Sequence, residues 1–183
     1  MQQAFETAFA ELGAVAAGID AGEVDLALDA ITEAGKIVLY GCGREGVQMQ
    51  GFAMRLYHLG FDVAMQGDMT TPPLGPGDLF IVSDGPGRLA TVDALTRVAQ
   101  DAGARVLLFT AEPKSEIASS SDLTVTIPAQ TMARDQAAPT SVLPMGSVYE
   151  GALFLLFEIM VLALRERVGA SAEDMRARHT NLE

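Results

Sequence analysis

The chain has 183 residues, a hydrophobic fraction of 49% and a formal net charge of −12 at pH 7. This length suits a single domain with a substantial core, and the acidity argues against nucleic acid or an anionic membrane as a partner, because binding either requires a basic surface. The single cysteine, Cys42, has no partner for an internal disulfide. The N-terminus lacks the basic start and apolar block of a signal peptide, so we expect a cytoplasmic protein.

Two amphipathic helices are expected at the start of the chain, within residues 1–35. Apolar residues follow helical spacing across residues 2–17, and Asp20 is placed to cap a second helix that ends at Gly35. The chain is also slightly apolar and rich in alanine and methionine. This composition favours a partner subunit over part of the apolar surface; the alternative is a simple alanine bias without assembly.

The middle of the chain, residues 36–128, alternates short apolar runs with helical patterns. Strands are predicted at 37–40, 61–65, 78–82, 105–109 and 123–127. Helices are predicted at 47–59, 88–102 and 113–119, and, after a polar stretch at 129–140, a long helix at 142–168 and a short one at 172–178 within the C-terminal segment 142–183. Apolar strands joined through helices predict an α/β protein, with a parallel sheet covered by helices on both faces. The longest apolar run, at 151–164, is too short to span a bilayer.

Two glycine-rich turns follow the first and third predicted strands, at residues 41–46 and 83–87. Ligands of parallel sheets bind beyond the carboxyl ends of the strands, so both turns are expected at the same crevice. The first turn fits the dinucleotide pattern Gly-x-Gly-x-x-Gly, and Asp62 lies at about the spacing of a ribose ligand. However, Asp62 falls near the start of the second strand, where a ribose ligand is not expected. A dinucleotide site therefore rests on the glycine pattern alone.

Several longer blocks resemble a known family. They are GCGREG, FAMRLYHLGFDV, GDMTTPP, GDLFIVS, LPMGSVYEGALFLLFE and MRARHTNLE, which together run from about Ile37 to Glu183. These blocks are similar to the sugar isomerase (SIS) domain, and within it to the 6-phospho-3-hexuloisomerase branch. The resemblance implies one SIS domain over residues 1–183, built as a three-layer αβα sandwich around a five-stranded parallel sheet. It also implies a homodimer or homotetramer that moves a carbonyl along a phosphosugar, with no cofactor and no metal.

The resemblance also implies a catalytic base. In the family a glutamate in the block similar to MGSVYEG takes this role, which corresponds to Glu150. A carboxylate near the first turn of a helix, partly screened from water, can lift a C–H proton to form an enediol and return it to the neighbouring carbon. The alternative is that Glu150 merely favours the positive end of the long helix.

The two histidines and the cysteine are weaker candidates. His179 lies in the tail, RHTNLE, where it has little structural reason to be unless it reaches a neighbour's site, so we predict a catalytic contribution from it. His58 lies at the end of its helix, where an imidazole suits the helix dipole without any further role. Cys42 is interpreted as a small residue in a tight turn rather than a reactive thiol.

The sequence departs from the family where the phosphate should bind. The family uses hydroxyls in both turns; aligned without a gap, these become Glu45, Asp84, Pro86 and Leu89, and a shifted alignment recovers only Ser83. Two carboxylates repel a phosphate, and Pro86 also lacks an N–H donor. The candidate substrate-binding residues are Gly43, Arg44, Glu45, Ser83, Asp84, Gly85, Gly87 and Arg88.

Three hypotheses follow for the function. The first is an aldose–ketose isomerase with altered substrate recognition, acting on a sugar or sugar phosphate. The second is a non-catalytic carbohydrate-derivative-binding or regulatory SIS protein. The third, a dinucleotide-dependent enzyme, has no support beyond the glycine pattern.

Overall fold

The structure, a computed structural model, describes residues 1–135 and 141–182. The predicted polar stretch at 129–140 and the tail block ending at Glu183 thus lie partly outside the described residues. The strands are β1 (Ile37–Gly41), β2 (Val63–Met65), β3 (Leu79–Ser83), β4 (Arg105–Thr110) and β5 (Leu123–Thr126). The helices are α1 (Gln2–Ala17), α2 (Ala21–Glu33), α3 (Gly43–Leu59), α4 (Ala90–Asp101), α5 (Glu116–Ser120), α6 (Met132–Asp135), α7 (Ser147–Arg167) and α8 (Ala172–Ala177), with a 3₁₀ helix, η1 (Pro144–Gly146), before α7.

The five strands form one parallel sheet in the order β2-β1-β3-β4-β5. This confirms the predicted α/β class and the five-stranded parallel sheet. The order reverses between β1 and β3, whose last residues are in register, Gly41 beside Ser83. The two glycine-rich turns therefore leave the sheet side by side at its carboxyl edge. This is the place where open α/β sheets bind ligands.

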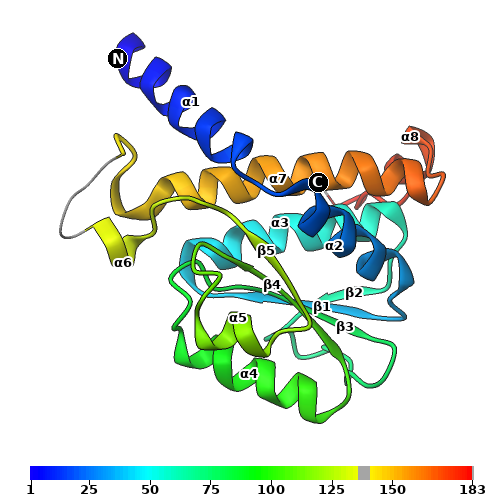
Figure 1. Ribbon diagram of the computed structural model, residues 1–183. Coiled ribbons are helices and arrows are strands. Elements are labelled where there is room, and N and C mark those ends of the chain that lie inside the picture. The colour runs from blue at the N-terminus through cyan, green and yellow to red at the C-terminus, as the bar shows by residue number, and fades with distance from the viewer. Residues whose placement is uncertain (136–140, 183) are drawn as a thin grey trace.

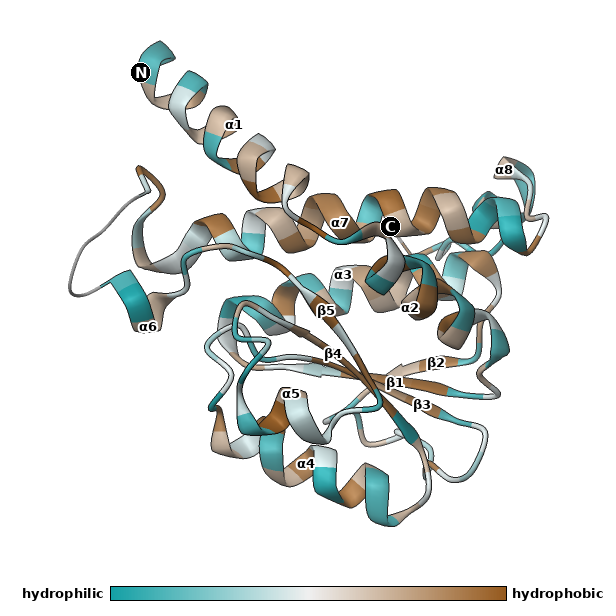
Figure 2. Cartoon of the chain, viewed as in Figure 1, coloured by the Kyte–Doolittle hydropathy of each residue, from teal (hydrophilic) through white to brown (hydrophobic). Residues whose placement is uncertain are grey.

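Helices cover both faces of the sheet (Figure 1). Helices α2, α3 and α7 lie on one face, and α4 and α5 lie on the other. The strands and much of α7 are the most hydrophobic parts of the chain (Figure 2). The buried apolar residues accordingly form two clusters, one on each side of the sheet, as parallel strands buried on both faces require.

Helix α7 is a core helix despite its composition. Together with η1 it is long and apolar enough to cross a membrane, but half of its most apolar stretch is buried within the protein. Its Phe157 stacks on Phe52 of α3, with ring centroids 4.3 Å apart. Stacking of this kind fixes α7 against α3, and so positions the residues at the start of both helices.

The predicted start of the long helix, at residue 142, is wrong. The chain instead makes the 3₁₀ turn Pro144–Gly146, in which Met145 and Gly146 adopt positive φ angles of 57° and 77°. The sequence pattern missed this break because Val142 and Leu143 extend the apolar spacing across it. The helix predicted to begin at residue 47 begins four residues earlier, at Gly43, and the other predicted boundaries differ from the structure by at most three residues.

The N-terminal helix is less buried than its pattern suggests. The stripe of apolar residues along α1 leaves Phe5 and Phe9 54% and 69% exposed, and Val15 is the helix residue that joins the core. Figure 1 shows α1 projecting from the body of the protein. Asp20 caps α2 as predicted, accepting a hydrogen bond from Glu23 N at 3.0 Å.

Candidate active site

A cavity of about 320 Å³ opens between the two glycine-rich turns and the start of α7. Three segments far apart in sequence line it: the first turn with the start of α3, the turn after β3, and the segment leading into α7. The lining residues are Cys42, Gly43, Arg44, Glu45, Pro86, Leu89, Thr131, Met132, Gly146, Tyr149 and Glu150. The predicted crevice is thus present, and both predicted acidic residues Glu45 and Glu150 face it.

Glycine is needed in the first turn for close packing rather than for a nucleotide. A Cβ atom on Gly46 would lie 2.5 Å from the carbonyl oxygen of Gly41, so only glycine allows α3 to begin so close to β1. Asp62 lies at the opposite edge of the sheet, where its carbonyl oxygen accepts a hydrogen bond from Ile37, the first residue of β1. The dinucleotide interpretation therefore loses its proposed ribose ligand.

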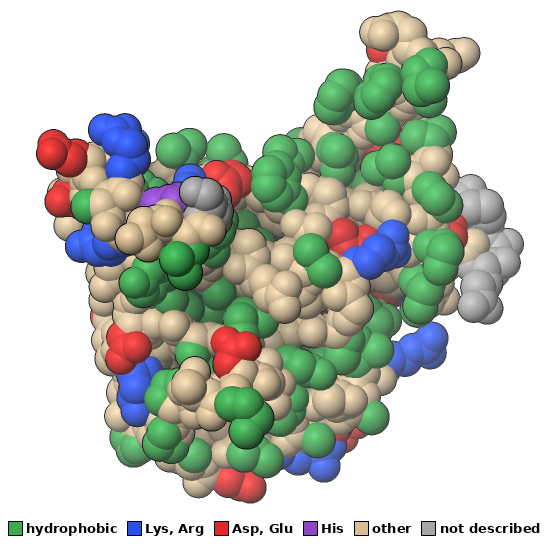
Figure 3. Space-filling view, turned by 180° about the vertical axis from the view of Figure 1, so that it is seen from behind, with side chains coloured by type: hydrophobic (Ala, Val, Ile, Leu, Met, Phe, Trp, Pro, Cys, Tyr) green, Lys and Arg blue, Asp and Glu red, His purple; other side chains and the backbone are tan. Residues whose placement is uncertain are grey.

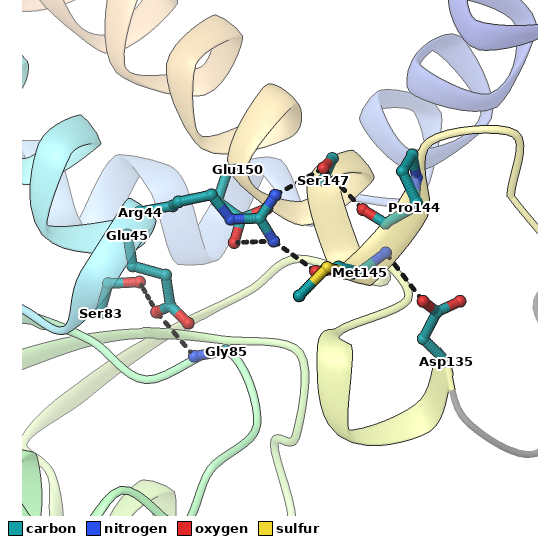
Figure 4. A network of polar contacts seen from close by, with 9 residues as sticks. All are labelled: Arg44, Glu45, Ser83, Gly85, Asp135, Pro144, Met145, Ser147 and Glu150. Carbon is teal, nitrogen blue, oxygen red and sulfur yellow. Dashed lines mark hydrogen bonds and ion pairs between the residues drawn. The ribbon is translucent and has the colours of Figure 1, made fainter.

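Arg44 and Glu150 form an ion pair between the first turns of α3 and α7 (Figure 4). Arg44 Nη2 lies 3.2 Å from Glu150 Oε1, and Arg44 Nη1 donates to Ser147 Oγ at 2.6 Å. Nη2 also donates to the carbonyl oxygen of Met145, in the turn before α7. Arg44 thereby holds both the carboxylate and the backbone turn that presents it.

Glu150 combines a buried carboxylate with an unused oxygen. Its side chain is 15% exposed, and among the described residues its Oε2 is buried with no hydrogen-bond partner. Burial raises the pKa of Glu150, while Arg44 and the residue's own backbone N–H oppose that rise. A carboxylate in this environment is more basic than one in water and has an oxygen available for a proton.

Glu45 points away from Arg44 and binds the second turn. Its Oε2 accepts hydrogen bonds from Ser83 Oγ at 2.6 Å and from Gly85 N at 3.0 Å (Figure 4). Burial raises the pKa of Glu45 to about 7; the hydrogen bonds from Ser83 and Gly85 oppose the rise, and the charges of Asp84 and Glu150 add to it. Glu45 is therefore a buried carboxyl group held by neutral donors rather than by a cation.

Tyr149 continues this hydrogen-bonded chain. Its hydroxyl lies 3.2 Å from Ser83 Oγ, and its side chain is fully buried. Burial raises the pKa of Tyr149 well above its usual value, and the charge of Glu45 adds to the effect. Tyr149 is thus a neutral phenol, which donates to Ser83 while Ser83 donates to Glu45.

Asp84 is structural in the observed geometry. It is fully buried, and its carboxylate accepts hydrogen bonds from Arg88 N at 3.2 Å and Leu89 N at 2.9 Å, at the approach to α4. Burial raises the pKa of Asp84, and these backbone donors, with Gly87, oppose the rise.

Arg88 itself is exposed and does not line the cavity. Ser83, Asp84, Gly85 and Gly87 therefore form the wall behind the cavity rather than its surface.

The two histidines lie together, away from the cavity. The rings of His58 and His179 are 5.2 Å apart, at the end of α3 opposite to Arg44 and Glu45. Glu45 and His58 are thirteen positions apart along α3, a helical rise of about 20 Å. One chain therefore does not bring His179 to Glu150, and its catalytic contribution remains a prediction that requires a second chain.

Sequence reasoning missed much of the cavity wall. Thr131 and Met132 come from the polar stretch that the pattern left without structure, and Gly146 comes from the turn hidden inside the predicted long helix. Tyr149 had a signal, since it directly precedes Glu150 in the MGSVYEG block. No group of three or more His, Cys, Asp or Glu side chains is placed to hold a metal ion in the described part of the chain.

Comparisons with known proteins agree with this geometry. The SIS domain family matches residues 30–155. The chain is 34% identical to a 3-hexulose-6-phosphate isomerase of Bacillus subtilis over 94% of both chains, and 35% identical to one of Mycobacterium gastri over 94% of this chain and 86% of that one. A crystal structure from Methanococcus jannaschii, from which a function of 3-hexulose-6-phosphate isomerase was inferred, matches with a TM-score of 0.79 and 28% identity, covering 88% of this chain and 86% of that one.

Proposed function

Since the chain belongs to the SIS domain family, we propose that it is a sugar isomerase of the aldose–ketose type, acting on a hexulose or a related sugar. The observation that carries the proposal is the state of Glu150. It is a buried carboxylate at a cavity, with one oxygen paired to Arg44 and the other without a partner among the described residues. A group that only stabilised the start of α7 would not need a buried, unpaired oxygen.

The reaction needs a base and no change in overall oxidation state. Glu150 Oε2 removes a proton from the carbon next to the substrate carbonyl; the C–H electron pair forms a carbon–carbon double bond, and the carbonyl π pair moves onto the carbonyl oxygen. That oxygen takes the proton of the neighbouring hydroxyl group, directly or through solvent, within the resulting enediolate. The carboxylic acid then returns its proton to the former carbonyl carbon while the neighbouring oxygen forms the new carbonyl, so that the carbonyl moves by one position. Arg44 keeps Glu150 ionised before the transfer, and burial makes it basic enough to accept the proton.

The other end of the cavity differs from what a phosphosugar site requires. Glu45 occupies donors of the second turn, and Arg44 is committed to Glu150. We therefore include altered substrate recognition in the proposal. The substrate remains a sugar or sugar derivative, as the relatives indicate.

We also propose one SIS domain per chain, a cytoplasmic protein and a homodimer or homotetramer. The assembly is supported by apolar side chains left exposed on α1, α3 and α7; examples are Phe9, Met54, Phe154 and Ile159. Figure 3 shows hydrophobic side chains gathered along α1 and across the back of the body. Such an assembly is also the route by which His179 of one chain reaches the cavity of another.

Replacing Glu150 by glutamine tests the proposed base. Glutamine keeps the shape but cannot accept the proton, so turnover of a ketose should fall by at least about 100-fold. The matched control is Glu158→Gln, on the same helix and also paired with an arginine of α3, which should retain turnover. Full activity in Glu150→Gln would contradict the assignment.

The non-catalytic alternative has one observation in its favour, the occupied donors of the second turn. Specific sugar binding by the wild type, with no turnover and no proton exchange, would support that alternative. In that case Glu150→Gln should change affinity rather than rate.

A further inference from the structure

The backbone donors of the second turn are already occupied by carboxylates of the chain itself. Gly85 N donates to Glu45, and the N–H groups of Arg88 and Leu89 donate to Asp84. The hydroxyl of Ser83 also donates to Glu45, at 2.6 Å. An anionic group of a ligand would need these donors, and it would have to displace a carboxylate that is 8% exposed or one that is fully buried.

Arg44, the basic residue that lines the cavity, is also already bound to other groups of the chain. Arg44 contacts Glu150, Ser147 and the carbonyl oxygen of Met145. It is the one basic side chain among the described residues that line the cavity, and two carboxyl groups, those of Glu45 and Glu150, line it as well. With all three ionised, the lining carries a net negative charge, which repels a phosphate or a carboxylate.

Glu45 keeps one oxygen for a neutral ligand. The hydrogen bonds that the described residues donate to Glu45 both reach Oε2. Its Oε1 is therefore left for a hydroxyl group of a ligand in the cavity. The nearby side chains of Pro86, Leu89 and Met132 offer an apolar wall for the C–H groups of a sugar. These features suit a polyhydroxylated compound without charge.

We infer that the cavity takes an unphosphorylated ketose or aldose, and that Glu45 determines this specificity by occupying the position of an anionic group. The inference rests on the proposed isomerase function, whose substrate class it names. The inferred substrate differs from that of the relatives in lacking a phosphate. The names of the relatives specify a 6-phosphate, whereas in this chain the turn that would receive an anion already holds an internal carboxylate.

Binding measurements test this specificity without requiring turnover. Wild-type protein is titrated with fructose, with a panel of other unphosphorylated hexuloses and pentuloses, with fructose 6-phosphate and with inorganic phosphate, by calorimetry and thermal shift. The pH is set above 7, where Glu45 is ionised, and the ionic strength is matched with chloride. At least one unphosphorylated sugar should bind, and fructose 6-phosphate should bind at least about tenfold more weakly than that sugar.

Two variants at Glu45 separate its charge from its volume. Glu45→Ser frees Gly85 N and adds a hydroxyl, so affinity for inorganic phosphate should rise by about 10- to 100-fold. Glu45→Gln removes the charge, but the glutamine side chain still occupies the position, so its affinity for inorganic phosphate should rise less than that of Glu45→Ser. Glu112→Gln, outside the cavity, is the control and should gain nothing.

The inference is overturned by any of three results. These are wild-type binding of fructose 6-phosphate as tight as that of any unphosphorylated sugar, no binding of any unphosphorylated sugar, and unchanged phosphate affinity in a folded Glu45→Ser protein. The wild-type titrations decide the question even if that variant does not fold. Failure of the isomerase proposal would appear differently, as sugar binding without proton exchange at carbon.

Discussion

Helices α3 and α7 are joined by two arginine–glutamate pairs, and the contrast between them separates the proposed site from a structural contact. Arg44 pairs with Glu150 at the start of the helices, and Arg55 pairs with Glu158 farther along. Glu158 is 39% exposed and has both oxygens near Arg55, at 3.1 and 3.2 Å. Glu150 is 15% exposed and has one oxygen without a partner among the described residues.

The difference arises from position rather than from the residue types. Both glutamates occupy the same helix and face the same neighbouring helix. Glu150, however, lies where the sheet ends and the two turns diverge, so a cavity opens beside it. An exposed pair such as Arg55–Glu158 contributes at most about 1 kcal/mol to stability, whereas a half-paired buried carboxylate is kept at a cost that function must explain.

The turn before α7 gives the largest expected effect. Gly146 has a φ of 77°, and a Cβ there would lie 2.4 Å from the backbone nitrogen of Met132. Gly146→Ala should therefore lower the free energy of unfolding by about 3 kcal/mol or more, and reduce activity by displacing Glu150. Gly169→Ala, at the other end of α7, meets open space at a similar positive φ and should cost about 1–2 kcal/mol. Equal losses in chemical denaturation would contradict this contrast.

Glu45 can be compared with the two paired glutamates, because it is a buried carboxyl group that is held by the neutral donors Ser83 and Gly85 rather than by an arginine. The pKa of Glu45 is about 7 in the folded protein against an ordinary 4.5, so between these values the unfolded chain releases a proton that the folded protein retains. The contribution of Glu45 to stability should thus be greatest below pH 4.5 and fall as the pH rises towards 7, by at most about 3 kcal/mol.

Glu45→Gln should flatten that dependence in denaturant unfolding measured across the pH range. Part of the slope should remain, because burial also raises the pKa values of Asp84 and Glu150. A slope that is identical in wild type and Glu45→Gln would show that this carboxyl group does not titrate as its burial implies.

The two arginines should differ in their effect on the pH–rate profile. Arg44 lowers the pKa of Glu150 against burial, so Arg44→Met should move the acidic limb of the profile to higher pH and cut turnover there by about tenfold. Arg44→Lys retains the charge and should move it less. Arg55→Met should leave the profile in place and change stability by no more than about 1 kcal/mol. A profile that stays unmoved in Arg44→Met would remove Arg44 from its positioning role.

The sequence predicted the fold well because its signals are local. Short apolar strands such as 37–40 and 105–109 alternate with helical spacing, and parallel pairing then follows from the connections. The placement of Glu150 near a helix start was also predicted, through the resemblance of MGSVYEG. The break at Pro144–Gly146 was not, because the apolar spacing continues across it.

The partners of the charged residues could not be predicted from sequence. Glu45 follows Arg44 directly, yet successive residues at the start of a helix point in different directions. Arg44 consequently faces α7 and Glu45 faces the turn after β3. His179 illustrates the same limit: its tail position suggested a site, and the fold of one chain places it on His58 instead.

Exchange of a carbon-bound proton with solvent tests the central claim most directly, because this exchange requires the proton removal that is assigned to Glu150. Fructose, the other unphosphorylated ketoses of the binding panel and fructose 6-phosphate are incubated with the protein in deuterated water, and deuterium next to the carbonyl is followed by NMR. A base at Glu150 predicts incorporation with wild type and with Glu158→Gln, and a loss of at least about 100-fold with Glu150→Gln. Incorporation at the wild-type rate in Glu150→Gln, or no incorporation into any of these sugars by wild type, would contradict it.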